Sequence, residues 1–170
     1  MPLLTQFIHK GYSMRQIHDL DVIILMATTL AAKRRPAQLV EIVAAADLLQ
    51  GTIPFVEKLG EAIRRLSVFG LISATENGFM LTPIAQELMA KQPKKADTEE
   101  LVVTIKSDLA AYDPKDDIPP ILLPEDELSA AILAHKASRK ARGQNLLMPK
   151  PKIDRHFKVE GRWRRASGTR

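Results

Sequence analysis

The stretch that decides the fold reads LGEAIRRLSVFGLISATENGFMLTPIAQELM and occupies residues 59–89. Its first part continues a helix that we expect to begin near Thr52, which suits an N-cap, with Pro54 in the first turn. Gly70 supplies the C-cap at the other end. Helical spacing predicts a buried stripe made of Val56, Leu59, Ile63 and Leu66.

The second part of the stretch predicts a β-hairpin followed by another helix. Residues 71–75 alternate loosely, and Asn-Gly is the strongest two-residue hairpin signal, so Glu76-Asn77-Gly78 makes the turn. Residues 79–82 form the return strand. Thr82 then caps a helix that has Pro83 at its first position. The apolar face of this helix consists of Ile84, Leu88 and Met89.

Two helices are expected before this stretch. Ser13 and Gln16 form a capping-box pattern, so the first helix is expected to begin near Ser13. Apolar residues recur at helical spacing after this start. The helix is expected to end near Lys33-Arg34-Arg35, because Pro36 disfavours helix in the residue before it. The second helix is expected from Ala37 to about Ala46.

The predicted order is therefore helix, helix, helix, strand, turn, strand, helix. Between Leu66 and Leu88 the sequence also contains the pattern L-x-x-x-G-L-I followed by G-x-x-L-T-x-x-A-x-x-L. This combination resembles the winged helix-turn-helix superfamily of bacterial transcription factors, especially regulators of the MarR and PadR type. The resemblance covers residues 13–91, about half of the chain. It implies a mainly α fold with a three-helix core and a short β-hairpin wing.

An accessory helix is expected over residues 97–113, beyond the resemblance. Its apolar stripe is made of Leu101, Val102, Ile105, Leu109 and Tyr112. A helix that flanks a winged domain often serves as a dimer contact in this superfamily, which implies a possible homodimer through this segment. The alternative is that the stripe packs back on its own domain, and the sequence leaves both open.

The remaining segments are two arms, a connector and a last helix. Residues 1–12 form an N-terminal arm, and four prolines in residues 114–124 predict an extended connector. A helix is expected over 125–142, with Leu128, Ile132 and His135 on one face. From residue 143 to 170 there is no periodicity, so a basic tail that stays disordered until a partner binds is expected.

Charge is concentrated at the C-terminus. The chain of 170 residues has 25 Lys and Arg against 20 Asp and Glu, a net charge of +5. Residues 136–170 hold 12 basic and 2 acidic groups, and 12 minus 2 gives +10. The other 135 residues hold 13 basic and 18 acidic groups, a net charge of −5. This pattern suggests a polyanionic partner for the basic arm, although a solvated tail has the same composition.

The resemblance also implies where nucleic acid would bind. The second helix of the motif, here Thr52–Ser67, would enter the major groove of duplex DNA, with the hairpin as a wing beside it. Two acids on its solvent side, Glu57 and Glu61, weaken this expectation, because carboxylates repel phosphates. The candidate contacts in this part are Lys33, Arg34, Arg35, Thr52, Lys58, Glu61, Arg64, Arg65, Thr75 and Asn77.

The basic arm provides a second set of candidate contacts. Trp163 stands among arginines, and aromatic rings interleaved with basic groups suit stacking on single-stranded or irregular nucleic acid. The candidates in the arm are Arg139, Lys140, Arg142, Lys150, Lys152, Arg155, Lys158, Arg162, Trp163, Arg164 and Arg165.

Other functional classes find little support in the sequence. The chain has no cysteine, and its four histidines lack metal-ligand spacing, so we expect no metal site, catalytic residue or cofactor. The most apolar run, residues 22–32, is too short to span a membrane. We therefore expect a cytoplasmic protein; the sequence does not indicate a small-molecule effector.

Two hypotheses of different classes follow from the sequence. In the first, the chain is a non-enzymatic DNA-binding protein, a transcriptional regulator that uses a winged helix and a basic C-terminal arm. In the second, it is an adaptor subunit of a larger assembly. Its winged domain then makes protein contacts, and its basic tail binds RNA, DNA or an acidic partner.

Overall fold

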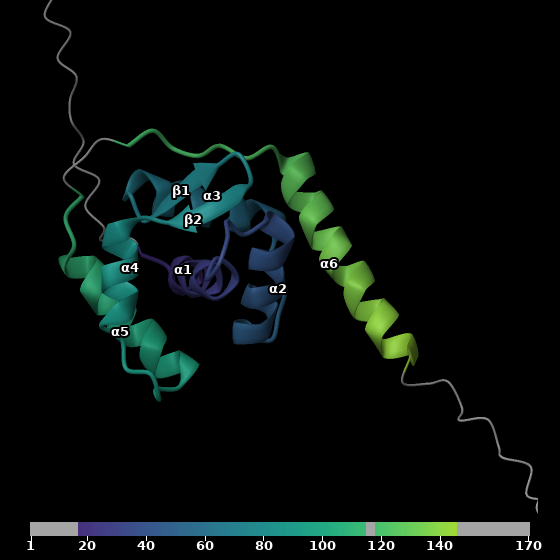
Figure 1. Ribbon diagram of the computed structural model, residues 1–170, viewed down its shortest axis with the longest axis horizontal. Helices are drawn as coiled ribbons and strands as arrows, with labels where there is room; N and C mark the ends of the chain where they lie inside the picture. The colour runs from purple at the N-terminus through teal and green to yellow at the C-terminus, as the bar shows by residue number, and fades with distance from the viewer. Residues whose placement is uncertain (1–16, 115–117, 146–170) are drawn as a thin grey trace, which may run out of the picture. The chain divides into compact units, whose positions relative to one another are not determined.

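The computed structural model describes residues 17–114 and 118–145, and the fold over these ranges is mainly helical, as predicted. The chain divides after Lys136, and the first of the two units contains almost all of the described residues. Figure 1 labels the elements along the chain. They are α1 (Asp19–Ala31), α2 (Leu39–Gln50), α3 (Val56–Val68), β1 (Ile72–Thr75), β2 (Gly78–Leu81), α4 (Pro83–Ala90), α5 (Thr98–Ala111) and α6 (Glu125–Asn145).

Helix α1 is the centre of the core. It packs against α2, α3, α4, α5 and strand β2, and Figure 1 shows it end-on with these elements around it. Val22, Ile24 and Leu25 are completely buried, as is Thr28, whose hydroxyl donates to the carbonyl oxygen of Ile24 at 2.8 Å. A helix that is apolar on nearly every side is stable only when other elements surround it.

The stripe predicted for the third helix is largely confirmed. Leu59, Ile63 and Leu66 are buried and Val56 is partly buried, so α3 turns this side towards the core. At the end of the helix, the amide of Gly70 donates to Ser67 and that of Leu71 to Leu66, at 2.9 Å each. This is the Schellman arrangement, which fulfils the C-terminal role predicted for Gly70.

The predicted starts of three helices were wrong. Helix α1 begins at Asp19, after an extended His18, whereas the Ser13–Gln16 pattern lies outside the described residues. Helix α2 begins at Leu39 rather than Ala37 and continues to Gln50. Ala37 instead pairs with Phe79 of the hairpin, and this long-range contact overrides its helical propensity.

Helix α3 begins later than the predicted N-cap at Thr52. Its first residue is Val56, and Phe55 is an extended N-cap without a side-chain hydrogen bond. Gly51 ends α2 in a left-handed conformation, so the residues after it, including Thr52 and the buried Pro54, form the loop between the two helices. This loop changes the direction of the chain between α2 and α3.

The hairpin and its turn form where they were predicted, with Gly78 in the return strand rather than in the turn. Strand β1 pairs antiparallel with β2, and Thr75 faces Gly78, so Glu76 and Asn77 are the two turn residues. No residue other than glycine has a positive φ in the described ranges, so Asn77-Gly78 is not the central pair of a type I′ turn. Gly78 has a φ of +139° and lies against the backbone of Ala37.

Helix α4 begins as predicted, whereas its apolar face differs. The Thr82 hydroxyl accepts from the amide of Ala85 at 3.4 Å, and Pro83 occupies the first helical position. Ala85 is fully buried, and Leu88 and Met89 pack against the core. Ile84 was expected on this face but is 48% exposed, since it lies at the edge of the face that is centred on Ala85.

Helix α5 packs back on its own domain, which was one of the two alternatives. Ile105 and Leu109 are completely buried, and the helix contacts α1 and α4. Lys106 Nζ also lies 2.6 Å from the Asp19 carboxylate at the start of α1. The predicted apolar stripe is therefore occupied within the same chain.

The segment after α5 returns to the domain. Residues 118–124 form neither helix nor strand, and the Ile121 amide donates to the Ser67 hydroxyl at 2.9 Å. Helix α6 begins at Glu125, as predicted, and continues to Asn145 rather than 142. Leu128, Ile132 and His135 are buried on one face, which confirms the predicted stripe.

The approach of Gly78 to Ala37 can be tested by mutation. A Cβ at position 78 would lie 2.3 Å from the Ala37 carbonyl oxygen, so Gly78→Ala must break the contact between Ala37 and Phe79. We expect Gly78→Ala to lower the free energy of unfolding by at least about 3 kcal/mol, measured by urea denaturation. Gly51→Ala is the control, because φ is also positive there but nothing lies within 4 Å. It should cost only about 1–2 kcal/mol. Equal losses would contradict this account.

Candidate nucleic-acid interface

The outward face of α3 is a narrow polar stripe. Glu57, Glu61 and Arg64 recur at positions i, i+4 and i+7, so they line one side of the helix, and all three are exposed. Lys58 is exposed beside them. The centre of the stripe therefore carries two carboxylates and one guanidinium, and its charge does not favour contact with phosphates.

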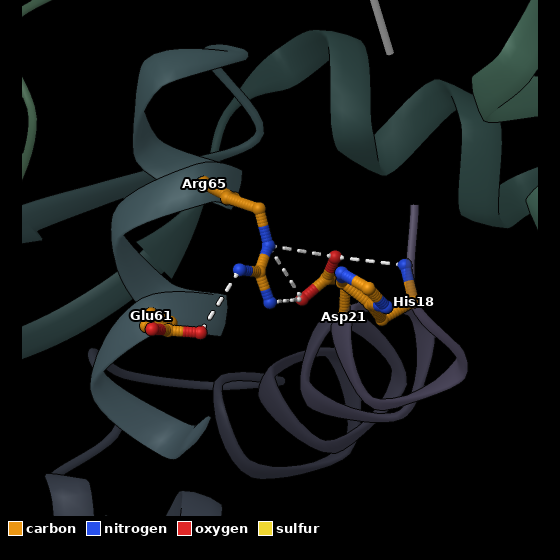
Figure 2. A network of polar contacts seen from close by, with 4 residues as sticks. All are labelled: His18, Asp21, Glu61 and Arg65. Carbon is orange, nitrogen blue, oxygen red and sulfur yellow. Dashed lines mark hydrogen bonds and ion pairs between the residues drawn. The ribbon is translucent and has the colours of Figure 1, made fainter. Parts of the chain in front are cut away.

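Arg65 was expected on this face, and the structure instead gives its guanidinium a partner inside the domain. Arg65 Nη2 lies 2.8 Å from Asp21 Oδ1, and Nε donates to both oxygens of that carboxylate at 3.0 and 3.2 Å. Figure 2 shows the guanidinium between Asp21 of α1 and Glu61 of α3. The predicted i,i+4 pair with Glu61 is confirmed at 3.3 Å.

The contact between Arg65 and Asp21 is a buried ion pair. The Asp21 side chain is only 4% exposed, and it also accepts a hydrogen bond from the His18 amide at 3.0 Å. The hydrogen bond to Asp21 is the largest effect on Arg65 and raises the pKa of its guanidinium, while burial acts in the opposite direction. All three guanidinium nitrogens of Arg65 therefore already contact carboxylates of the domain, those of Asp21 and Glu61.

The basic loop between α1 and α2 lies beside the hairpin. Ala37 and Phe79 exchange both backbone hydrogen bonds, at 2.9 and 2.8 Å, which ties residues 33–36 to the start of β2. A groove of about 770 Å³ runs along this junction, and Arg35 and Asn77 are among its lining residues. Two parts of the predicted interface, the basic loop and the tip of the hairpin, are therefore brought together.

The three cations of this loop are not equivalent. Arg35 forms a salt bridge with Glu41. A hydrogen bond from the Gln38 amide, aided by Arg35, lowers the pKa of the Glu41 carboxyl, with burial acting against them. Lys33 and Arg34 are exposed, and neither forms an ion pair within the described ranges. They are the cations of the loop best placed to meet a phosphate.

The tip of the hairpin offers polar groups without positive charge. Thr75, Glu76 and Asn77 are all exposed, and the Thr75 hydroxyl donates to the carbonyl oxygen of Gly78 at 3.0 Å.

An exposed aromatic ring at the start of α3 was not among the predicted contacts. Phe55, at the N-cap, is 75% exposed, with Lys58 Nζ 6.0 Å from its ring centre. An N-cap without a polar side chain could have pointed to it.

One flank of α3 is covered by residues 118–136, which the sequence analysis also missed. A groove of about 250 Å³ is lined by Glu57, Gly60 and Arg64 of α3 together with the connector and the start of α6. A Cβ at Gly60 would lie 2.9 Å from Leu128 Cδ1, so Leu128 sits directly on the helix backbone. A glycine inside a helical pattern can indicate such a close approach, and Gly60 was the available signal.

The other predicted contacts are dispersed or lie outside the described residues. Thr52 is exposed in the loop before α3, and Arg139 and Lys140 are exposed near the end of α6. The backbone of Arg142 belongs to α6, while its side chain lies outside the described part. The remaining contacts predicted in the arm, from Lys150 to Arg165, also lie outside the described residues.

Within the described residues there is neither a cluster of metal-ligating side chains nor a membrane-spanning helix. No group of three or more His, Asp or Glu side chains there is placed to hold a metal ion. His135 and Asp47 lie 2.8 Å apart, but this pair joins α6 to α2 as a packing contact. None of the helices in the described ranges has the length and apolarity that crossing a bilayer requires.

No family model, curated protein or solved structure matches this chain.

The structural role of Arg65 predicts a large difference between neighbouring arginines. Arg65→Ala leaves the Asp21 carboxylate buried without its main partner, so we expect a loss of about 3–5 kcal/mol in the free energy of unfolding. Arg64→Ala removes an exposed side chain from the same helix and should cost no more than about 0.5 kcal/mol. Thermal and urea unfolding of both variants measure the difference. If the two losses were similar, the ion pair would not hold α3 to α1.

Proposed function

We propose that the chain is a non-enzymatic DNA-binding protein, a transcriptional regulator built on a winged helix-turn-helix, acting in the cytoplasm. The observation that carries the proposal is the Ala37–Phe79 backbone pairing. It holds the basic loop against the hairpin, and β1 of that hairpin in turn packs against α3. A helix, a hairpin that packs against it and a basic loop held to that hairpin are the parts that a winged reader of duplex DNA needs.

In this proposal α3 enters the major groove and the hairpin follows the backbone beside it. Lys58 and Arg64 of α3, with Lys33 and Arg34 of the loop, are exposed cations that would contact phosphates. The ring of Phe55, at the first turn of α3, would make an apolar contact with a thymine methyl group. Contacts of these two kinds separate positioning on the duplex from sequence readout.

The basic arm supplies most of the affinity in this proposal. The face of α3 carries Glu57 and Glu61, which oppose phosphate binding, whereas residues 136–170 carry a net charge of +10. Neutralised phosphates release counterions, and this release dominates non-specific affinity. The domain would therefore set position and register, and the arm would hold the protein on the duplex.

The acidic centre of the α3 face favours a second candidate function. As an adaptor subunit, the chain would use this face for a protein partner and the arm for RNA, DNA or an acidic surface. Glu57 and Glu61 would then contact a basic partner instead of tolerating a phosphate. Both functions use the same α3 face, and they differ in the sign of the charge that it meets.

A homodimer is a separate part of the proposal. The apolar stripe of α5 is occupied by α1 and α4, so a second copy would have to use the opposite side of residues 97–113. Val103 on that side is 69% exposed. The resemblance alone suggests this contact, and sedimentation at several concentrations measures it.

Removing the arm should change the salt dependence of binding. Residues 146–170, which follow the end of α6, contain eight basic and two acidic groups. If about eight phosphates are contacted by the whole chain, log K falls with log salt at a slope of about −6 to −7. In the chain ending at residue 145 the slope should shrink to less than half. Residual preference for one duplex sequence would support the regulator, whereas complete loss of nucleic-acid binding would favour the adaptor.

Neutralising one acid tests whether α3 meets DNA. Glu57→Gln removes a carboxylate from the proposed reading face, so we expect duplex affinity to rise several-fold at low salt. Glu87→Gln is the control, because Glu87 is an exposed residue of α4 and the change removes the same charge away from the α3 face. Fluorescence anisotropy with one labelled duplex compares the two. An equal effect of both changes would indicate that α3 does not contact the duplex.

A further inference from the structure

Residues 118–136, the connector and the first turns of α6, form specific contacts along one flank of α3. At one end, Ile118 Cδ1 lies 2.7 Å from where a Cβ of Gly70 would be. In the middle, the Ile121 amide donates to the Ser67 hydroxyl at 2.9 Å. Leu128 then fills the space that the missing side chain of Gly60 leaves open. We call this segment the cover.

The far end of the cover is fixed to α2. His135 Nε2 lies 2.8 Å from Asp47 Oδ2, and both side chains are about one-tenth exposed. Ala131 and Ile132 are buried between these two attachment points. The cover is therefore held at both ends, and its position along α3 is defined by side-chain contacts.

The cover lies next to the proposed reading face. On a helix of 3.6 residues per turn, Gly60, Arg64 and Ser67 are neighbours, so the cover borders the stripe of Glu57, Glu61 and Arg64. It also brings Glu125 to the groove lined by Glu57 and Arg64, whereas Glu127 lines the groove that contains Arg35 and Asn77. This arrangement adds negative charge beside α3.

The width of the major groove limits what can enter it together with α3. A helix with its side chains is about 10–12 Å across, and the major groove is about 12 Å wide. The groove therefore admits α3 alone, and a second segment packed on the flank of α3 must meet the edge of the groove. The carboxylate of Glu125 would then face phosphates.

We propose that the cover is an autoinhibitory element, which packs on α3 and must be displaced before α3 can enter duplex DNA. This inference rests on the proposed DNA-binding function. The apparent affinity for the duplex is then reduced by the fraction of molecules in which α3 is uncovered. Any change that weakens the seat of Leu128 on Gly60 raises that fraction.

Two leucines of α6 give a matched test in the full chain. Leu128→Asp places a charge against Gly60 and releases the cover, whereas Leu133→Asp makes the same change at a side chain that is 63% exposed. Both variants add one negative charge. Under the proposal, Leu128→Asp binds a mixed-sequence duplex about tenfold more tightly than Leu133→Asp at low salt. Adding Arg64→Ala to Leu128→Asp should remove most of the gain.

A milder variant is needed in case Leu128→Asp disturbs the whole domain. Ser67→Ala removes the hydroxyl that accepts from the Ile121 amide, so exchange of that amide with solvent should become faster. Circular dichroism verifies that the helices remain. Under the proposal, this variant also binds the duplex more tightly than wild type, by a smaller factor.

The outcomes separate the two proposals. Equal binding by wild type, Leu128→Asp, Ser67→Ala and Leu133→Asp, with faster exchange at Ile121, would overturn the autoinhibitory role and leave DNA binding in place. No duplex binding by any of these proteins at low salt would overturn both. Tighter binding that survives the added Arg64→Ala would also overturn the inference, because the gain would then not pass through α3.

Discussion

The position of α3 depends on the buried contact between Asp21 and Arg65. A carboxylate that is 4% exposed is tolerable only if its oxygens are satisfied, and here the guanidinium and the His18 amide satisfy them. The contact joins the central helix α1 to α3 and fixes the rotation of α3 about its axis. That rotation decides which residues point outward: Glu57, Glu61 and Arg64.

Local signals predicted the elements of this fold well. Thr82 with Pro83 begins α4, Gly70 ends α3, and the hairpin forms before and after Glu76-Asn77, because each feature depends on residues close in sequence. The starts of α2 and α3 were misplaced where a distant partner or a required loop outweighed local propensity. The Ala37–Phe79 pairing is the clearest example, since no local pattern reveals it.

The candidate site was harder to predict than the fold, because its contacts join residues that are distant in the sequence. Arg65 looks like an exposed cation in the sequence, yet its partner Asp21 is 44 positions away. Leu128 reaches Gly60 only because the connector returns to the domain. Such contacts depend on how helices pack, so a single sequence does not disclose them. The exposure of Lys33, Arg34 and Lys58 was predictable from their charge.

These contacts suggest a division of labour within the chain. The domain presents a face with mixed charge, one flank of which is occupied by residues 118–136, and the net positive charge of the chain lies beyond residue 135. In the proposed regulator, attraction by the arm brings duplex DNA close, and the domain then determines where it binds. The α3 face attracts phosphate only weakly by itself. It therefore binds only where contacts with bases also form, which suits a mechanism in which the arm attracts the duplex first.

The central claim is that α3 and the hairpin contact duplex DNA directly. Amide chemical shifts of the full isotope-labelled chain, recorded while a duplex is added, test it residue by residue. The account predicts the largest shift changes in residues 56–64, in the hairpin at 72–81 and in the loop at 33–36. Changes confined to residues 137–170, with α3 and the hairpin unaffected, would contradict it.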